Sequence, residues 1–249
     1  MALSLCLGGL AHGQEAWIVP LSPLLGDVAT QPASGMGIAQ SGGVQVGTSI
    51  SNMGRQTAVR AIGGVSMSIG VLPGLTSSIA AACSLDGTTI VGTCFSGGPA
   101  RAFRYVGGAL TDLGVPPVSP ASFPRCSSVS WSGGLIGGLV ATGSAGTTLR
   151  GWVHEAGVFT MVGLLPGATA NPVRAVSGDG TYAAGDSDLG GTTVAYRWSR
   201  SRGSAVLVSP PASGPCSAIG LSSDGSIVLG NCGNVGALRA VVWVGSSPL

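Results

Sequence analysis

Two glycines recur five times along this chain at nearly constant intervals, and this periodicity limits the possible folds more than any other feature. The first glycine of each copy follows a serine in two copies and an aspartate in the other three. Its successive intervals are 45, 46, 47 and 45 residues, for Gly42, Gly87, Gly133, Gly180 and Gly225. The second glycine always follows five residues later, at Gly47, Gly92, Gly138, Gly185 and Gly230. Self-similarity at such a period indicates a repeat fold such as a propeller or a solenoid.

The residues of each copy predict a β-hairpin. Ser-Gly or Asp-Gly between apolar segments favours a tight turn, because glycine accepts a positive φ and the preceding side chain hydrogen-bonds the backbone. The residues after the turn, as in TTIVG and SIVLG, suit a strand that is buried on at least one face. We expect the second glycine to mark a bulge or a close backbone approach.

A second hairpin follows the first in each copy. It reads ARAFRYVGGALTDLG at 100–114, with counterparts at 57–70, 149–163 and 193–208. Aromatic residues recur two positions apart in its first strand, so they share one face and are expected to pack in the core rather than to bind a ligand. They are Phe103, Tyr105, Trp152, Tyr196, Trp198 and Trp243, with Val241 in the first position of the last copy.

Four short antiparallel strands in about 45 residues match the size of a propeller blade. We therefore predict an all-β protein, a β-propeller of five four-stranded blades. The blades are expected at residues 33–74, 78–117, 122–167, 168–211 and 213–249. The fifth repeat ends after its third strand, and residues 16–27 match the fourth-strand pattern of 65–74. The N-terminal strand is therefore expected to complete the last blade and to close the ring, although two chains sharing a larger ring is an alternative.

The repeat also has a recognisable motif. A strand reading ARAF is followed by TDLG within 100–114, and the hairpins at 84–93 and 133–138 carry a G-x-x-x-x-G spacing. This pattern resembles the HAF family of extracellular bacterial repeats. Arg101 stands where that family has His, and Ser replaces the usual Asn at Ser84, Ser130, Ser177 and Ser222. The resemblance implies a secreted or surface-associated β-repeat protein and transfers no catalytic residue.

The first residues favour export. They form a short apolar stretch that ends in small residues, with Ala11 and Gly13 at the positions a signal peptidase requires. We predict a signal peptide at residues 1–13 and a single repeat domain at 14–249. A basic segment is missing, which leaves open whether the natural start lies upstream of Met1, and a disordered N-terminal tag is the alternative. No apolar run reaches about eighteen residues, so no transmembrane segment is expected, and the predicted location is secreted, periplasmic or cell surface.

Composition excludes several functions. Charged residues make up 8% of the chain, the net charge is +2 and the arginines are scattered, so no nucleic-acid partner is expected. Only two histidines occur, His12 in the predicted signal peptide and His154 on an aromatic position, which argues against a catalytic triad or a His-based metal site. No cofactor and no metal are predicted.

The acidic residues offer one pair outside the repeat pattern, Asp186 and Asp188. Two converging carboxylates could serve a secreted glycan hydrolase or lyase. Asp-x-Asp followed by glycine can also begin a calcium loop, but the later ligands are missing. An ordinary surface loop is the competing interpretation.

The cysteines predict one disulfide. Cys216 and Cys232 flank the hairpin at 222–226, and a three-residue loop at 223–225 would place them opposite each other. Cys94 is equivalent to Cys232, but Ser78 occupies the position of its partner. The pairing of Cys83, Cys94 and Cys126 is left open.

These observations favour a non-catalytic binding or interaction module, with a glycan or a surface protein as its partner. Carbohydrate is a natural ligand class because exposed tryptophans stack on sugar faces, and Trp131, outside the aromatic positions, is the best candidate. No catalytic residue is assigned. The alternatives are a structural surface repeat protein and a secreted glycan hydrolase or lyase.

Overall fold

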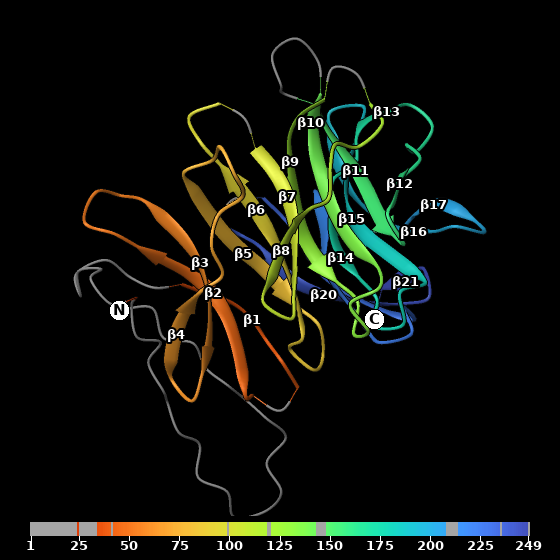
Figure 1. The fold of residues 1–249 in the computed structure, drawn as a ribbon. Coiled ribbons are helices and arrows are strands. Elements are labelled where there is room, and N and C mark those ends of the chain that lie inside the picture. Colours follow the sequence, from red (N-terminus) through yellow and green to blue (C-terminus); the bar gives the residue numbers. More distant parts are fainter. Residues whose placement is uncertain are drawn as a thin grey trace, which may run out of the picture. The chain divides into compact units, whose positions relative to one another are not determined.

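The computed structural model describes residues 24, 34–40, 42–98, 100–118, 121–142, 148–207, 214–234 and 236–248. Every regular element in these ranges is a β-strand, so none of them is a helix able to cross a membrane. The strands form five antiparallel sheets, each built from one continuous stretch of chain (Figure 1). The chain divides into two compact units, Met1–Gly114 and Val115–Leu249. The predicted signal peptide and, apart from Leu24, residues 16–27 lie outside the described residues.

The first unit holds two sheets of four strands in sequential order. The first sheet contains β1 (Ser34–Ile38), β2 (Val44–Ile50), β3 (Gln56–Ile62) and β4 (Val65–Ser68). The second contains β5 (Ser77–Cys83), β6 (Thr89–Phe95), β7 (Ala100–Val106) and β8 (Ala109–Asp112). One core cluster joins the two sheets, with Val46 and Ala58 from the first and Ile90, Phe103 and Tyr105 from the second.

The second unit holds three sheets. The third sheet contains β9 (Ala121–Val129), β10 (Ile136–Thr142), β11 (Thr148–Glu155) and β12 (Val158–Met161). The fourth contains β13 (Ala168–Ala170), β14 (Val173–Val176), β15 (Tyr182–Leu189), β16 (Thr192–Ser199) and β17 (Gly203–Val206). The fifth contains β18 (Cys216–Leu221), β19 (Ile227–Cys232), β20 (Arg239–Val244) and β21 (Ser247–Pro248). Proline lacks the N–H that a ladder needs, and the first strand of the fourth sheet is divided into β13 and β14 beside Pro172.

The hairpin turn at the first glycine of each copy is present. Each of these glycines has the positive φ that the turn requires, between 67° and 76°, at Gly42, Gly87, Gly133, Gly180 and Gly225. The turn joins the first and second strands of every sheet, as the sequence predicts.

A bulge lies opposite the second glycine in every sheet, but the extra residue belongs to the neighbouring strand. Gly92 pairs with Ala80, and Val91 pairs with Ala82, so Ala81 is skipped. The same register shift recurs in the other four sheets. A bulge bends its strand and increases the local twist, so this feature shapes the first strand of each repeat in the same way.

Close packing explains why the second glycine carries no side chain. A Cβ on Gly92 would lie 2.1 Å from the carbonyl oxygen of Ile79 and 2.5 Å from the ring of Phe103. Gly138 meets Trp152 and Gly230 meets Trp243 in the same manner. These aromatic rings are fully buried, as expected for core residues.

The fifth sheet has a short fourth strand, β21, formed by C-terminal residues. The sequence instead predicts that residues 16–27 supply this strand. In β21, Pro248 pairs with Trp243 and Ser247 pairs with Val244. The fourth strands β4, β8, β12 and β17 each pair with four residues of their third strand. Within the described residues, Val241 and Val242 of β20 therefore lack the fourth-strand partner that their counterparts have.

Candidate functional site

The turns between first and second strands carry a repeated network around an aspartate. In the fifth repeat, Oδ1 of Asp224 accepts hydrogen bonds from the hydroxyl of Ser222 at 2.7 Å and from the backbone N–H and hydroxyl of Ser226 at 3.0 and 2.8 Å. Asp86 and Asp179 are bound in the same way. The Ser222 hydroxyl also accepts the N–H of Ile227. The turn aspartates are thus held in place by their own turns.

Hydrogen bonding to the ionised form lowers a carboxyl pKa. The N–H of Ser226, followed by the hydroxyls of Ser222 and Ser226, lowers the pKa of Asp224 to about 2. The pKa of Asp86 is also lowered, chiefly by the Ser84 hydroxyl and then by Thr88. Both side chains are therefore carboxylates at neutral pH.

Replacing Asp224 with alanine is expected to lower stability more at pH 7 than at pH 2. The folded-state pKa lies below the ordinary value of 3.8, so the contribution is present above about pH 4 and is lost as the pH falls towards 2. Urea unfolding of the wild type and of Asp224→Ala across this range measures the difference. Asp224→Asn, which keeps the acceptor oxygen, serves as the control. An equal loss at both pH values would contradict the prediction.

Trp131 lies in the turn of the third repeat, and its indole packs on Gly178 in the turn of the fourth. A Cβ on Gly178 would lie 2.6 Å from both Cδ2 and Cε2 of the indole. The backbone N–H of Trp131 donates to the Gly178 carbonyl at 2.9 Å. Trp131 is 48% exposed, whereas the other described tryptophans, Trp152, Trp198 and Trp243, are at most 5% exposed. The ligand-binding residue predicted from the sequence is thus an exposed aromatic ring that packs against the backbone at Gly178.

The turns of the fourth and fifth repeats are joined next to it. The N–H of Asp179 donates to the Ser223 carbonyl at 2.8 Å. Tyr182 packs against Gly225, and the guanidinium of Arg197 lies 5.0 Å from the Tyr182 ring centre while donating to the Gly225 carbonyl at 2.8 Å. The three successive turns of this unit therefore form one connected surface.

Asp186 and Asp188 lie in strand β15 rather than in a surface loop. Asp186 accepts from Nε of Arg174 at 2.7 Å. Asp188 accepts from the hydroxyl of Thr169 at 3.2 Å and from the N–H of Gly191 at 3.0 Å. The two carboxylates have separate partners, and this arrangement fits structural roles in the fourth sheet.

His154 is buried in β11 and pairs with Ile136, as Tyr105 pairs with Ile90. Its ring contacts Phe159 edge-on at 4.7 Å. Over the described part of the chain, no three His, Cys, Asp or Glu side chains are grouped to hold a metal ion.

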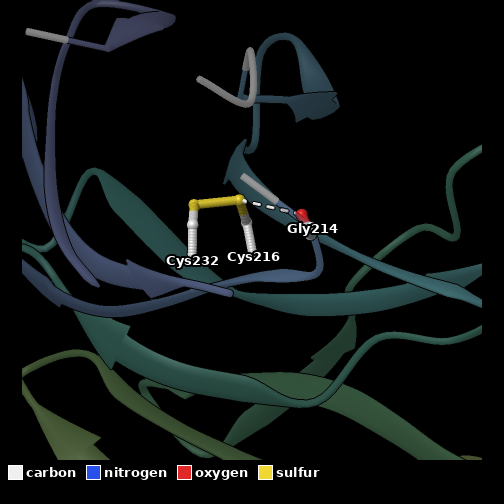
Figure 2. The surroundings of a disulfide bond; sticks show 3 residues. All are labelled: Gly214, Cys216 and Cys232. Carbon is white, nitrogen blue, oxygen red and sulfur yellow. Dashed lines mark hydrogen bonds between the residues drawn. A yellow bond between two sulfur atoms is a disulfide. The ribbon is translucent and has the colours of Figure 1, made fainter. Parts of the chain in front are cut away.

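The predicted disulfide is formed. Cys216 and Cys232 are direct partners in the β18–β19 ladder, and their sulfur atoms are bonded (Figure 2). The Cys216 sulfur lies 3.6 Å from the Gly214 carbonyl oxygen. No disulfide joins Cys83, Cys94 and Cys126 to one another. Burial, then the nearby Asp86 charge, raises the pKa of Cys83 to about 11, so this thiol is a poor nucleophile.

Two buried polar residues that the sequence did not reveal connect successive sheets. Asn171 accepts the N–H of Gly151 through Oδ1 and donates through Nδ2 to the carbonyls of Val162 and Gly163. Ser78 accepts the N–H of Ala58 and donates to the Gly70 carbonyl. A polar residue directly before or within an otherwise apolar first strand is the signal that could have identified them.

Replacing Asn171 with alanine is expected to cost about 2 kcal/mol of unfolding free energy, because buried backbone groups lose their partners. Asn171 is 1% exposed, so water cannot replace the amide without a rearrangement. Urea unfolding measures the effect, with Asn52→Ala, at an exposed asparagine, as the control. A change below about 0.5 kcal/mol, the usual range at the surface, would contradict this role.

No protein-family model matches the sequence, and no curated protein matches it. Solved structures do. TolB from Acinetobacter baumannii matches with a TM-score of 0.60 at 12% identity, over 87% of this chain and 52% of that one. Putative TolB from Agrobacterium tumefaciens matches with a TM-score of 0.58 at 11% identity, over 86% and 77%. Prolyl oligopeptidase B from Galerina marginata matches with a TM-score of 0.58 at 10% identity, over 87% and 32%.

The fold is a β-propeller. The chain spans about half the length of the Acinetobacter TolB that it matches. At 10–12% identity these likenesses concern the fold alone, because one fold hosts many functions. The function of the site therefore depends on its own residues.

Proposed function

We propose that this protein is an exported five-bladed propeller that binds carbohydrate without catalysis, and that its repeats are of the HAF type. The observation that carries the binding proposal is Trp131, an exposed indole fixed by its contact with Gly178. A ring held in one orientation loses little side-chain entropy when a ligand stacks on it. The Cys216–Cys232 disulfide supports export, because disulfides persist in oxidising compartments.

Repeat equivalence supports closure of one ring within one chain. Val46 and Cys83 belong to one core cluster in the first unit, and Ala184 and Leu221 to another in the second. Leu229 in the fifth sheet is equivalent to Val46 and Ala184. Ile38 in the first sheet is equivalent to Cys83 and Leu221. Leu229 and Ile38 are 46% and 43% exposed. A closed ring requires these two apolar side chains to meet.

Leu24 supports the assignment of residues 16–27 to the part of the fifth sheet's fourth strand that β21 does not supply. Its N–H donates to the Ser49 hydroxyl at 3.2 Å. The N–H of Leu72, which follows β4, contacts the Cys94 sulfur at 3.4 Å. Ser49 and Cys94 are equivalent, so Leu24 occupies the position of a residue that follows a fourth strand.

A disulfide is expected to form within one chain when Ile38 and Leu229 are both replaced by cysteine. Mild oxidation followed by non-reducing electrophoresis and peptide mass mapping detects the link. Ile62→Cys with Leu229→Cys is the control, because Ile62 is equally exposed at 44% but is not an equivalent partner. A link between two chains, or none, would contradict closure of a single-chain ring.

Binding to oligosaccharides is expected to fall about tenfold on Trp131→Ala, a loss of about 1.4 kcal/mol. A glycan array of the full chain, with and without calcium, identifies the ligand set, and titration calorimetry measures the loss. Phe123→Ala is the matched control, because Phe123 is exposed to a similar extent, 41%. Unchanged binding by Trp131→Ala would remove this residue from the site. A folded sample that binds no glycan would favour a structural role or a protein partner.

A further inference from the structure

The charge around Trp131 is set by the turns beneath it. The indole rests on Gly178, and the next residue along the chain is Asp179. Asp179 is exposed, and the hydrogen bonds from Ser177 and Thr181 fix its carboxylate at the tip of the turn. The residue that follows the glycine under the indole is therefore a carboxylate held by its own turn.

A second carboxylate lies beside the first. The N–H of Asp179 donates to the Ser223 carbonyl, and the following residue is Asp224. The two side chains are close enough for the charge of Asp224 to act on the pKa of Asp179. Hydrogen bonds reach Asp224 through Oδ1 from Ser222 and Ser226, so its second oxygen can accept from a ligand.

Arg197 brings a basic side chain to these turns, whereas Arg200 lies in the β16–β17 hairpin. Arg197 donates to the Gly225 carbonyl and stacks over Tyr182. Arg200 forms an ion pair with Glu155 at 2.5 Å. The partners of Arg197 are neutral, so its positive charge remains and opposes the two carboxylates of Asp179 and Asp224. The net fixed charge of the linked turns is therefore negative.

We propose that the Trp131 surface selects uncharged and amino sugars over acidic sugars, an inference that rests on the carbohydrate binding proposed above. The indole stacks on the apolar face of a sugar ring. The carboxylates of Asp179 and Asp224 accept hydrogen bonds from hydroxyl or ammonium groups and repel a carboxylate of the ligand.

Three hexasaccharides test this selection on the full chain: cellohexaose, fully deacetylated chitohexaose and hexagalacturonate. Titration calorimetry is expected to give at least about fivefold tighter binding of the first two than of the uronate at low salt. The preference for the amino sugar should weaken as salt is raised, because exposed charges are screened. Trp131→Ala should weaken the binding of both favoured ligands.

Charge variants separate this inference from the binding proposal. The double variant Asp179→Asn/Asp224→Asn keeps acceptor oxygens in both turns. It is expected to reduce the affinity ratio of the favoured sugars over hexagalacturonate at least about threefold. Asp86→Asn is the matched control, because Asp86 has the same turn network in the other unit, and it should leave the preference unchanged. Trp131-dependent binding that is equal or tighter for hexagalacturonate would overturn the selection alone. Binding of none of the three, or binding independent of Trp131, would overturn both proposals.

Discussion

Replacing Gly138 with alanine is expected to destabilise the second unit by at least about 3 kcal/mol, at the upper end of the usual cost of overfilling a packed core. The new Cβ would lie 2.2 Å from the Arg125 carbonyl oxygen and 2.3 Å from Cζ2 of Trp152. Neither neighbour can move freely. Arg125 belongs to the β9–β10 ladder, and Trp152 is fully buried. Either the ladder or the core must therefore be distorted.

Gly163→Ala is the matched control, because nothing lies within 4 Å of a Cβ at Gly163. Urea unfolding compares the two variants. In the Trp152→Leu background, Gly138→Ala should cost less stability than in the wild type, because the contact with the ring is gone. Part of the cost should persist, because the contact with the Arg125 carbonyl remains. A wild-type midpoint for Gly138→Ala would show that the glycine is not required for packing.

Removing the Cys216–Cys232 disulfide is expected to cost about 3 kcal/mol, the value for a closed loop of about 15 residues. The bonded residues are 16 positions apart and nearly inaccessible to solvent. Cys216→Ala/Cys232→Ala avoids placing polar groups there. Without the covalent link, the unfolded chain gains the freedom that the loop had removed.

Unfolding with and without dithiothreitol measures this effect. The reductant should lower the midpoint of the wild type and leave that of the double variant unchanged. Cys94→Ala is the control, because Cys94 occupies the equivalent ladder position opposite Ser78 and carries no disulfide. A wild-type midpoint that is insensitive to complete reduction would contradict the prediction.

Local patterns in the sequence were sufficient for the turns, the strands and the disulfide. The turn at Gly225 depends on residues within three positions of it, namely Asp224 and its bonds to Ser222 and Ser226. Counting along the same hairpin places Cys216 opposite Cys232. Period-two spacing placed Trp152 and His154 on one buried face of β11. The site prediction at Trp131 also began locally, since this tryptophan lies outside the repeated aromatic positions.

Export, the ligand and the closure of the ring by residues 16–27 stay predictions. Residues 1–13 and, apart from Leu24, residues 16–27 lie outside the described ranges. The ligand can be identified only by a binding experiment. The carboxylates Asp186 and Asp188 illustrate the same limit within the fold. Their spacing was visible in the sequence, but their different partners, Arg174 and Thr169, come from neighbouring strands of the fourth sheet.

The sequence by itself determined the five repeats, their hairpins and the buried aromatic positions, because these follow from residues a few positions apart. Only the tertiary structure decided which side chains join one repeat to the next. The seat of Trp131 on Gly178 and the hydrogen bonds of Asn171 to Gly151 and Val162 link different repeats. Such contacts depend on how two sheets pack, and packing is decided by shape and by buried polar groups rather than by local periodicity.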